Sequence, residues 1–365
     1  MKFNIPYLSG KEKEYVAQAI ESRHISGDGS FTKNCQQWFE QRFGFKKAFL
    51  TTSCTDALEM AAILLDLKPE DEVIVPSFTF VSTANAFLLR GARIVFTDSR
   101  PDSPNIDVDQ VEKRINLKTK VILVMHYAGF SCDMEKIMAL AKKYNLYVVE
   151  DAALALGSTY NGKPLGSFGH LSAFSFHETK NISCGEGGML IVNSEKFIKR
   201  AEIIREKGTN RSAFFRGEVD KYGWNDIGSS FLPSDLLAAY LYAQLEAFDH
   251  IQSTRMKAWN LYYEGLKDIE TITLPPRTDH NASIFYFTCA NLEERTNLIY
   301  HLKQNDVPAS FHYQALHKSA FANSGKSLPN AEKYSDTLIR LPLYVELSED
   351  KVRTITDLIK KYFNK

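Results

Sequence analysis

Residues 172–181, with the sequence SAFSFHETKN, decide the fold class, because an apolar, strand-like run ends there in a polar turn that carries one lysine, Lys180. A second apolar run, residues 146–149, ends in the acidic pair Glu150 and Asp151. Open α/β sheets bind ligands in the crevice at the carboxyl ends of their strands. If the two runs are neighbouring buried strands, Lys180 and Asp151 face the same crevice.

A lysine and an aspartate in one crevice suit a particular chemistry. The lysine amine forms a Schiff base with an aldehyde cofactor, while the carboxylate keeps the cofactor's ring nitrogen protonated and the ring an electron sink. Pyridoxal 5'-phosphate is the cofactor that requires both groups. The competing interpretations are a solvated surface charge for Lys180 and a helix N-cap in EDAALAL for Asp151.

Length and composition exclude several classes of protein. The chain of 365 residues exceeds one average domain, which predicts two domains in contact. Its 44 Lys and Arg residues balance 44 Asp and Glu residues, which argues against non-specific binding to nucleic acid or to membrane surfaces. The five scattered cysteines form no C-x-x-C pair, so we expect reduced thiols, no disulfide framework and no metal site.

The N-terminal stretch MKFNIPYLSGKEKEYV lacks the apolar core of a secretory signal. Nothing in the sequence approaches the ~18 uninterrupted apolar residues of a membrane span. We therefore expect a cytoplasmic protein.

Apolar runs alternate with helical patterns over the first part of the chain. The expected strands are 47–52, 72–76, 93–98, 121–126, 146–151, 172–176 and 188–192. The expected helices are 11–21, 32–42, 56–65, 82–89 and 133–144. Strands that alternate with helices imply a mostly parallel sheet covered on both faces, and so an α/β fold.

The pattern changes from residue 234 onward. An apolar-periodic helix at 234–248 leads into another at 252–265, followed by short strands at 271–274 and 283–290. Helices are expected at 293–304 and 350–363. We therefore predict a large cofactor-binding domain of residues 1–249 and a smaller α+β domain of residues 250–365. The N-terminal segment, about residues 1–22, is expected to pack on the small domain.

Residues 50–64, LTTSCTDALEMAAIL, predict a strand, a Ser/Thr turn and a helix start. The backbone N–H groups of Thr55 and Asp56, at the positive end of the helix dipole, suit the phosphate of the cofactor. Ser-x-x-Asp before a helix is also ordinary capping. Ser175 is either a further phosphate contact or a buried, satisfied serine.

Aromatic and imidazole side chains are further candidates. Phe78 and Phe80 follow a strand at alternate positions, and either one stacks on the cofactor ring or both belong to the core. His126, at a strand end, and His312 with Tyr313, in SFHY, suit the edge of a substrate. Packing is the alternative interpretation for each of these three.

Taken together, FSFHETKN, VVEDAA, TSCTDALEMAA, PSFTFVSTANA, MHYAGF and SFHY resemble the DegT/DnrJ/EryC1/StrS family of nucleotide-sugar aminotransferases. The resemblance extends in order from residue 26 to residue 344. It implies the fold type I of pyridoxal phosphate-dependent transferases, with a mostly parallel seven-stranded sheet in the large domain and a smaller α+β domain. It also implies a homodimer with shared active sites.

The resemblance implies a role for individual residues. Lys180 holds the cofactor and later shuttles protons, and Asp151 pairs with the ring nitrogen. The implied ring and phosphate contacts are Phe80, Thr55, Asp56 and Ser175. A neighbouring subunit completes the phosphate site in such enzymes, and the stretch GSSF assigns that role to Ser230.

One residue departs from the family pattern. Many members have glutamine after acidic-Asp-Ala-Ala, where it reaches the cofactor hydroxyl, whereas this chain has Leu154. A leucine side chain cannot donate a hydrogen bond. Either another group serves, or the electronics of the cofactor differ.

The resemblance also implies substrates. Residues 205–224 and 226–241 resemble members that aminate a dTDP-4-keto-6-deoxyhexose, with L-glutamate as donor, for cell-surface polysaccharides such as lipopolysaccharide O-antigen or enterobacterial common antigen. Arginine forks onto phosphate oxygens, so the candidates for binding the nucleotide are Arg205, Arg211 and Arg216. Ordinary surface arginines are the alternative.

Other functions stay open at this stage. A 3-keto sugar aminotransferase of the same fold shares every motif above. A pyridoxal phosphate-dependent sugar dehydratase also has this fold, but related dehydratases carry histidine where this chain has Lys180. A non-catalytic cofactor-binding relative is the alternative that Leu154 suggests.

Overall fold

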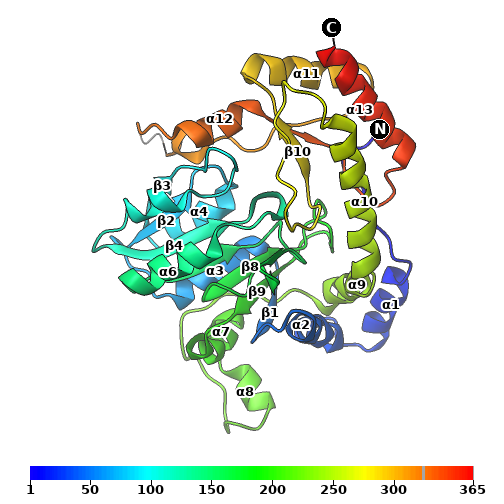
Figure 1. The fold of residues 1–365 in the computed structure, drawn as a ribbon. Helices are drawn as coiled ribbons and strands as arrows, with labels where there is room; N and C mark the ends of the chain where they lie inside the picture. The colour runs from blue at the N-terminus through cyan, green and yellow to red at the C-terminus, as the bar shows by residue number, and fades with distance from the viewer. Residues whose placement is uncertain (323–324, 365) are drawn as a thin grey trace.

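The described part of the chain, residues 1–322 and 325–364 of a computed structural model, builds a seven-stranded sheet between layers of helices (Figure 1). The strands are β1 (Ala48–Thr51), β2 (Glu72–Pro76), β3 (Arg93–Thr97), β4 (Thr119–Met125), β5 (Tyr147–Asp151), β8 (Leu171–Ser175) and β9 (Gly188–Val192). Their order is β1-β9-β8-β5-β4-β2-β3, and β9 alone among them runs antiparallel to its neighbours. The expected strands and the mostly parallel α/β sheet are confirmed.

Successive side chains of the central strands face opposite helix layers. In β2, Val73 and Val75 pack with α3 (Cys54–Leu64) and α4 (Val81–Leu88). Ile74 between them packs instead with α6 (Met134–Tyr144). A strand buried on both faces requires apolar residues at every position, which explains the uninterrupted apolar runs in the sequence.

Short polar side chains begin the helices that flank the sheet. Ser53, Asp133 and Ser234 each accept a hydrogen bond from the backbone N–H three residues further on, at the start of α3, α6 and α9 (Asp235–Glu246). The remaining helices of this part are α1 (Glu12–Glu21), α2 (Ser30–Phe43), α5 (Val108–Glu112), α7 (Ile198–Arg205) and α8 (Arg211–Phe215). The short helices α5, α7 and α8 were not expected. None of the described helices has the length and apolar character needed to cross a membrane.

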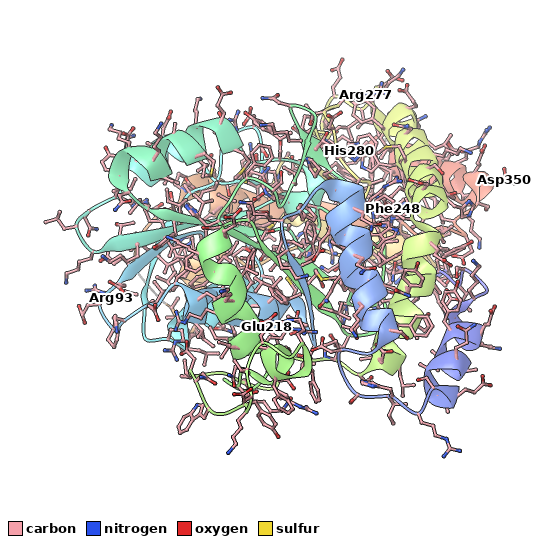
Figure 2. The ribbon with its side chains drawn as sticks, turned by 90° about the horizontal axis from the view of Figure 1, so that it is seen from below. Arg93, Glu218, Phe248, Arg277, His280 and Asp350 are labelled. Carbon is pink, nitrogen blue, oxygen red and sulfur yellow. The ribbon has the colours of Figure 1, made fainter. Side chains whose placement is uncertain are left out.

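The C-terminal part begins with the long helix α10 (Phe248–Leu266), which packs against α13 (Glu349–Phe363). Figure 2 shows Asp350, in α13, on the side of the molecule opposite to Arg93, at the start of the edge strand β3. A two-stranded antiparallel sheet joins β10 (Phe285–Thr288) to β11 (Leu338–Leu341), with α11 (Leu292–Gln304) and α12 (Pro329–Thr337) beside it.

Three elements of this part differ from expectation. The strand expected at 271–274 is wrong, because Thr273 makes only an isolated bridge to Thr288. Pro275 and Pro276 follow it, and proline has no N–H to extend a ladder. The partner of β10 is instead β11, which was not expected, and neither was α12.

The N-terminal segment contacts both halves of the chain. Helix α1 lies against α9, where the Lys11 ammonium pairs with Glu246 at 2.9 Å. The residues before α1 extend to the C-terminal half, where the Met1 amine donates to the Asp306 carbonyl (3.2 Å) and the Arg340 guanidinium lies over the Phe3 ring. The division of the chain at residue 249 stays a prediction.

Gly188 begins β9 where this strand passes the turn before α3. A Cβ at this position would lie 2.3 Å from the Ser53 carbonyl carbon and 2.4 Å from the Cys54 nitrogen. Both are backbone atoms, so Gly188→Ala must displace either the turn or the strand. We expect the free energy of unfolding in urea to fall by about 1–3 kcal/mol. Gly223→Ala is the matched control, because its Cβ meets nothing within 4 Å; equal stability of the two variants would contradict this account.

Candidate active site

A cavity of about 840 Å³ lies at the carboxyl ends of β4, β5 and β8, where they face the C-terminal part of the chain. The sequence-predicted residues that line it are Thr55, Phe80, Asp151, Ser175, Lys180, His312 and Tyr313. Those that do not line it are Asp56, Ser230, Arg205, Arg211 and Arg216. Two strands separated in sequence by a loop and a small hairpin thus bring the aspartate and the lysine to one space.

Asp151 ends β5 and is held at both oxygens. Its Oδ2 accepts a hydrogen bond from the Thr83 hydroxyl (2.7 Å), and its Oδ1 accepts one from the Ala153 N–H (3.1 Å). Burial raises the pKa of Asp151, and these hydrogen bonds and the nearby charge of Lys180 lower it. No helix follows within residues 152–158, all of which are described, so the N-cap alternative is wrong. The Asp151 carboxylate therefore caps no helix, and it lines the cavity, where it can face a ligand.

Lys180 lies in the turn of residues 176–187 that joins β8 to β9. Its N–H donates to the His177 carbonyl (2.8 Å), which fixes the backbone at this position. The side chain is half-buried at the cavity and lies within electrostatic range of Asp151 and Cys54. Burial lowers the pKa of Lys180, and these two acidic groups raise it. The net lowering enlarges the fraction of unprotonated amine, which is the nucleophilic form.

The start of α3 forms a polar end of the cavity. The Asp56 N–H donates to the Ser53 hydroxyl (3.0 Å), and the Asp56 carboxylate accepts from the Thr52 hydroxyl. Within the described residues, the N–H groups of Cys54 and Thr55 have no protein acceptor. An anion at this helix end therefore meets Cys54 and Thr55 first, whereas Asp56 contributes its N–H only if Ser53 releases it.

Hydroxyl groups flank this polar end. The Thr55 hydroxyl donates to the hydroxyl of Ser82 at 2.9 Å, and the Ser175 hydroxyl accepts from the His177 N–H at 3.4 Å. All four residues line the cavity. A lysine amine, a carboxylate fixed by two donors and a helix start with free N–H groups in one cavity fit pyridoxal phosphate, which needs a partner for its aldehyde, its ring nitrogen and its phosphate.

The structure separates the two phenylalanines that follow β2. Phe78 is fully buried, with its ring centroid 5.4 Å from that of Tyr127, so it belongs to the core. Phe80 lines the cavity with 54% of its surface exposed, 6.1 Å from the Tyr313 ring. His312 stacks on Tyr313 (3.7 Å) and shares a hydrogen bond of 3.0 Å with the Tyr127 hydroxyl. Burial lowers the pKa of His312 well below its usual range, so its imidazole is neutral.

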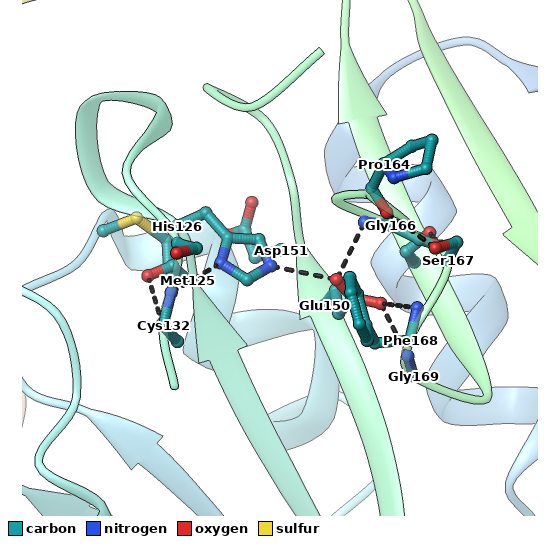
Figure 3. Close-up of polar contacts among 12 residues, drawn as sticks. Met125, His126, Cys132, Glu150, Asp151, Pro164, Gly166, Ser167, Phe168 and Gly169 are labelled. Atoms are coloured by element: carbon teal, nitrogen blue, oxygen red, sulfur yellow. Dashed lines mark hydrogen bonds and ion pairs between the residues drawn. The ribbon is translucent and has the colours of Figure 1, made fainter. Parts of the chain in front are cut away.

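A hydrogen-bond network around the fully buried side chains of Glu150 and His126 lies behind Asp151 (Figure 3). The Glu150 carboxylate accepts a hydrogen bond from Nε2 of His126 at 2.9 Å. Its other donors are the backbone N–H groups of Gly166 (2.8 Å), Phe168 (2.9 Å) and Gly169 (2.6 Å). The Cys132 N–H donates to Nδ1 of His126 (3.2 Å), so the ring proton sits on Nε2. His126 therefore belongs to the support of the site and does not reach a substrate.

The three arginines proposed for the nucleotide lie elsewhere in the protomer. Arg205 is only 3% exposed and donates to the Leu50 carbonyl (2.8 Å) and to Asp28 (2.7 Å). The partners of Arg211 and Arg216 are Glu206, Glu202 and Glu218. Helices α7 and α8 extend away from α12 and the C-terminal part (Figure 1), which is why these side chains do not reach the cavity of their own chain.

Some residues that build the site were not expected from the sequence. Thr83 and Ser82 lie in the first turn of α4, and no local pattern marks them, because their partners are distant in sequence. Arg340 lines the cavity from β11, a strand that was itself not expected. The run RLPLY was the one signal at this place in the sequence.

We expect the hydrogen bonds of Glu150 to contribute to the free energy of unfolding of the protein. Glu150→Gln replaces an acceptor oxygen by an NH₂ group that faces N–H donors, so at least one of them loses its partner. We expect the free energy of unfolding to fall by about 1.5–3 kcal/mol, as measured by urea denaturation. Glu21→Gln, on an exposed position, is the control and should leave stability unchanged. An unchanged midpoint for Glu150→Gln would contradict the network's role.

Comparison with known proteins identifies the family. The model of the DegT/DnrJ/EryC1/StrS aminotransferase family matches residues 6–360. The chain is 31% identical to a GDP-perosamine synthase of Escherichia coli O157:H7 over 362 residues, which cover 98% of this chain and 97% of that protein.

Solved structures agree with this assignment. PseC of Helicobacter pylori, an aminotransferase of pseudaminic acid biosynthesis, superposes with a TM-score of 0.92 and 26% identity over 100% of this chain and 99% of that one. The PLP-form of the putative sugar aminotransferase Spr1654 from Streptococcus pneumoniae also superposes with a TM-score of 0.92 and 26% identity, over 100% and 98%. The chain therefore belongs to the DegT/DnrJ/EryC1/StrS aminotransferase family and is a sugar aminotransferase that uses pyridoxal phosphate.

Proposed function

We propose that the protein transfers the amino group of L-glutamate to the keto carbon of a dTDP-4-keto-6-deoxyhexose. The products are 2-oxoglutarate and a dTDP-4-amino-4,6-dideoxyhexose, with the galacto form favoured. The observation that carries the proposal is that Lys180 and Asp151 line one cavity with an unpaired helix start. The sugar is inferred from residues 205–224 and 226–241, which resemble dTDP-4-amino-4,6-dideoxygalactose transaminase.

The chain's own groups have distinct tasks in this proposal. Lys180 would hold the cofactor, and its free amine would move a proton to and from the reacting carbon. Asp151 would hold the proton of the ring nitrogen, while Thr83 and the Ala153 N–H keep that carboxylate in place. Phe80 would hold the ring by stacking. The bound cofactor supplies the electron sink that makes these proton transfers feasible.

The phosphate contacts follow the polar end of the cavity. We assign the phosphate to the start of α3 with Thr55, Asp56 and Ser175, and we assign the substrate edge to His312 and Tyr313. The neutral imidazole of His312 supports this assignment, because it donates and accepts hydrogen bonds without repelling Lys180.

The remaining contacts are proposed across a homodimer. Ser230 does not line the cavity of its own chain and is exposed, which suits a contact with the cofactor phosphate of a second subunit. Exposed aromatic side chains on and after α8 support an interface there: Phe215 (69%), Tyr222 (53%) and Trp224 (86%). In such a dimer Arg211 and Arg216 are the arginines best placed to meet a nucleotide of the neighbouring site, because Arg205 is buried.

Other acceptor substrates differ from the proposed one in the nucleotide or in the position of the keto group. GDP-perosamine synthases are among the relatives of this chain, so a GDP-keto sugar is the main competitor of the dTDP-keto sugar. A 3-keto sugar is the alternative acceptor on the same nucleotide. We place the reaction in the cytoplasm, in the synthesis of a cell-surface polysaccharide such as O-antigen or enterobacterial common antigen.

Leu154 raises the alternative that the protein binds the cofactor without catalysing turnover. Its side chain is buried at the cavity, and its carbonyl accepts a hydrogen bond from the Asn281 side chain (2.9 Å). A leucine removes one donor to the cofactor but none of the groups that perform proton transfer. We therefore favour a catalytically active aminotransferase over a non-catalytic cofactor-binding protein.

Lys180 should be the attachment site of the cofactor. Borohydride reduction of the holoenzyme followed by peptide mass mapping should place the pyridoxyl group on Lys180. Lys180→Ala should abolish both this label and turnover, since no other amine replaces the nucleophile. Lys163→Ala, at an exposed lysine, is the control and should keep both. A label on another residue would overturn the assignment.

The acceptor is tested by product analysis. Holoenzyme with L-glutamate should convert dTDP-4-keto-6-deoxyglucose to an amino sugar whose NMR couplings report an axial amine at C4. GDP-4-keto-6-deoxymannose, offered at equal concentration, should react at least tenfold more slowly in kcat/KM. Faster conversion of the GDP sugar would refute the dTDP assignment. A product without an amine would instead identify a dehydratase, and a cofactor spectrum unchanged by glutamate a non-catalytic protein.

A further inference from the structure

Arg340 enters the cavity from β11 on a rigid backbone. In the two-stranded sheet it lies opposite Tyr286. On its other side it forms a bridge with Ser310, in which the Arg340 N–H donates to the Ser310 carbonyl (2.7 Å) and the Ser310 N–H donates back (3.2 Å). Pairing on both sides fixes the Cα position, so the guanidinium is presented to the cavity from a defined point.

The guanidinium of Arg340 has no acidic partner in the described chain. Its Nε and Nη2 approach the Phe311 carbonyl at only 3.4 and 3.3 Å, and its Cζ lies 5.1 Å from the Phe3 ring centroid. Two tyrosines, Tyr127 and Tyr313, are the groups whose charge would stabilise its cation, and burial lowers its pKa. Since an arginine carries five N–H donors, most of the binding capacity of Arg340 is unused.

Several other arginines of the described chain make shorter hydrogen bonds than Arg340 does. Arg255, which also lines the cavity, donates to the backbone carbonyls of Ala282, Ser283 and Leu343. Arg205, Arg211 and Arg216 each pair with a carboxylate. Arg340 therefore differs from them: its half-buried guanidinium pairs with no carboxylate of the described chain and makes only two long hydrogen bonds, both to the Phe311 carbonyl.

The charge of Arg340 acts on the reaction centre. It lowers the pKa of Lys180 and that of His312, so its guanidinium lies within electrostatic range of both. The carboxylate closest to this chemistry, Asp151, is already held by Thr83 and by a backbone N–H. Lys180 and Arg340 thus face one cavity. Of the carboxylates that line it, Asp151 is already held and Glu186 is exposed beside His177, which leaves the Arg340 guanidinium for an anionic ligand.

We propose that Arg340 binds the carboxylate of the amino-acid donor and is the residue that selects an amino acid as donor. The inference rests on the proposed transamination. The α-carboxylate is bonded directly to the carbon that gives up its amine and whose proton Lys180 would move, so a cation within range of Lys180 suits it. The diphosphate of a nucleotide sugar is separated from its reacting keto carbon by the sugar ring. A guanidinium matches the two oxygens of a carboxylate as a fork.

The two half-reactions test this assignment. Arg340→Gln holoenzyme should need at least about 30-fold more L-glutamate for half-maximal conversion of the cofactor spectrum, because one partner of a desolvated charge pair is lost. Arg340→Lys, which keeps the charge but not the fork, should recover part of this loss. Apoenzyme reconstituted with pyridoxamine phosphate bypasses the donor, and there the KM for the keto sugar should stay within about twofold of wild type. Arg277→Gln, at an exposed arginine paired with Glu264, is the matched control.

Binding of a ligand that cannot react tests the role of Arg340 independently of turnover. Glutarate, a dicarboxylate without an amine, should bind wild-type holoenzyme in isothermal titration, and Arg340→Gln should weaken this binding by a similar factor. A shift of the keto-sugar KM as large as that for glutamate would overturn the proposal and assign Arg340 to the diphosphate. Unchanged glutamate and glutarate affinities in both variants would also overturn it. If wild type binds glutarate through Arg340 but L-glutamate leaves its spectrum unchanged, the proposed donor fails while the carboxylate site stands.

Discussion

The parallel pairing of β5 with β8 is the constraint on which the active site depends. Glu150 lies opposite Ser172, and Asp151 lies opposite Ala173. This register brings the end of β5 beside the strand that leads to Lys180. A slip of one residue would turn Asp151 away from the cavity and send Glu150 out of its buried network, because successive side chains of a strand face opposite sides. The adjacent carboxylates thus have different roles: Glu150 accepts hydrogen bonds inside the protein, and Asp151 faces the cavity.

The network of Glu150 shows how this register is maintained. A carboxylate that is fully buried must find hydrogen-bond donors, and Glu150 finds one imidazole and three backbone N–H groups from residues 166–169. The same loop precedes β8. The network therefore ties β4, β5 and the entrance of β8 together directly behind Asp151, where rigidity benefits proton transfer.

Fold and substrate are separate questions in this family. Solved sugar aminotransferases with 26% identity share the fold at a TM-score of 0.92, although PseC and the GDP-perosamine synthase are named for different sugars. A fold carries many functions, and the site decides among them. Leu154 and Arg340 are two of the side chains that line the cavity of this chain. The leucine side chain cannot donate a hydrogen bond, and Arg340 brings a cation to the cavity.

The sequence by itself determined the central α/β sheet and the pair Lys180 and Asp151, because buried parallel strands leave uninterrupted apolar runs and their polar ends mark the crevice. The tertiary structure alone decided that Phe80 faces the cavity while Phe78 is core, that Thr83 holds Asp151, and that Arg205 is buried away from the site. It also revealed β11 and with it Arg340. Each of these depends on contacts between residues distant in sequence, whose positions follow from the packing of whole elements and leave no periodicity in the chain.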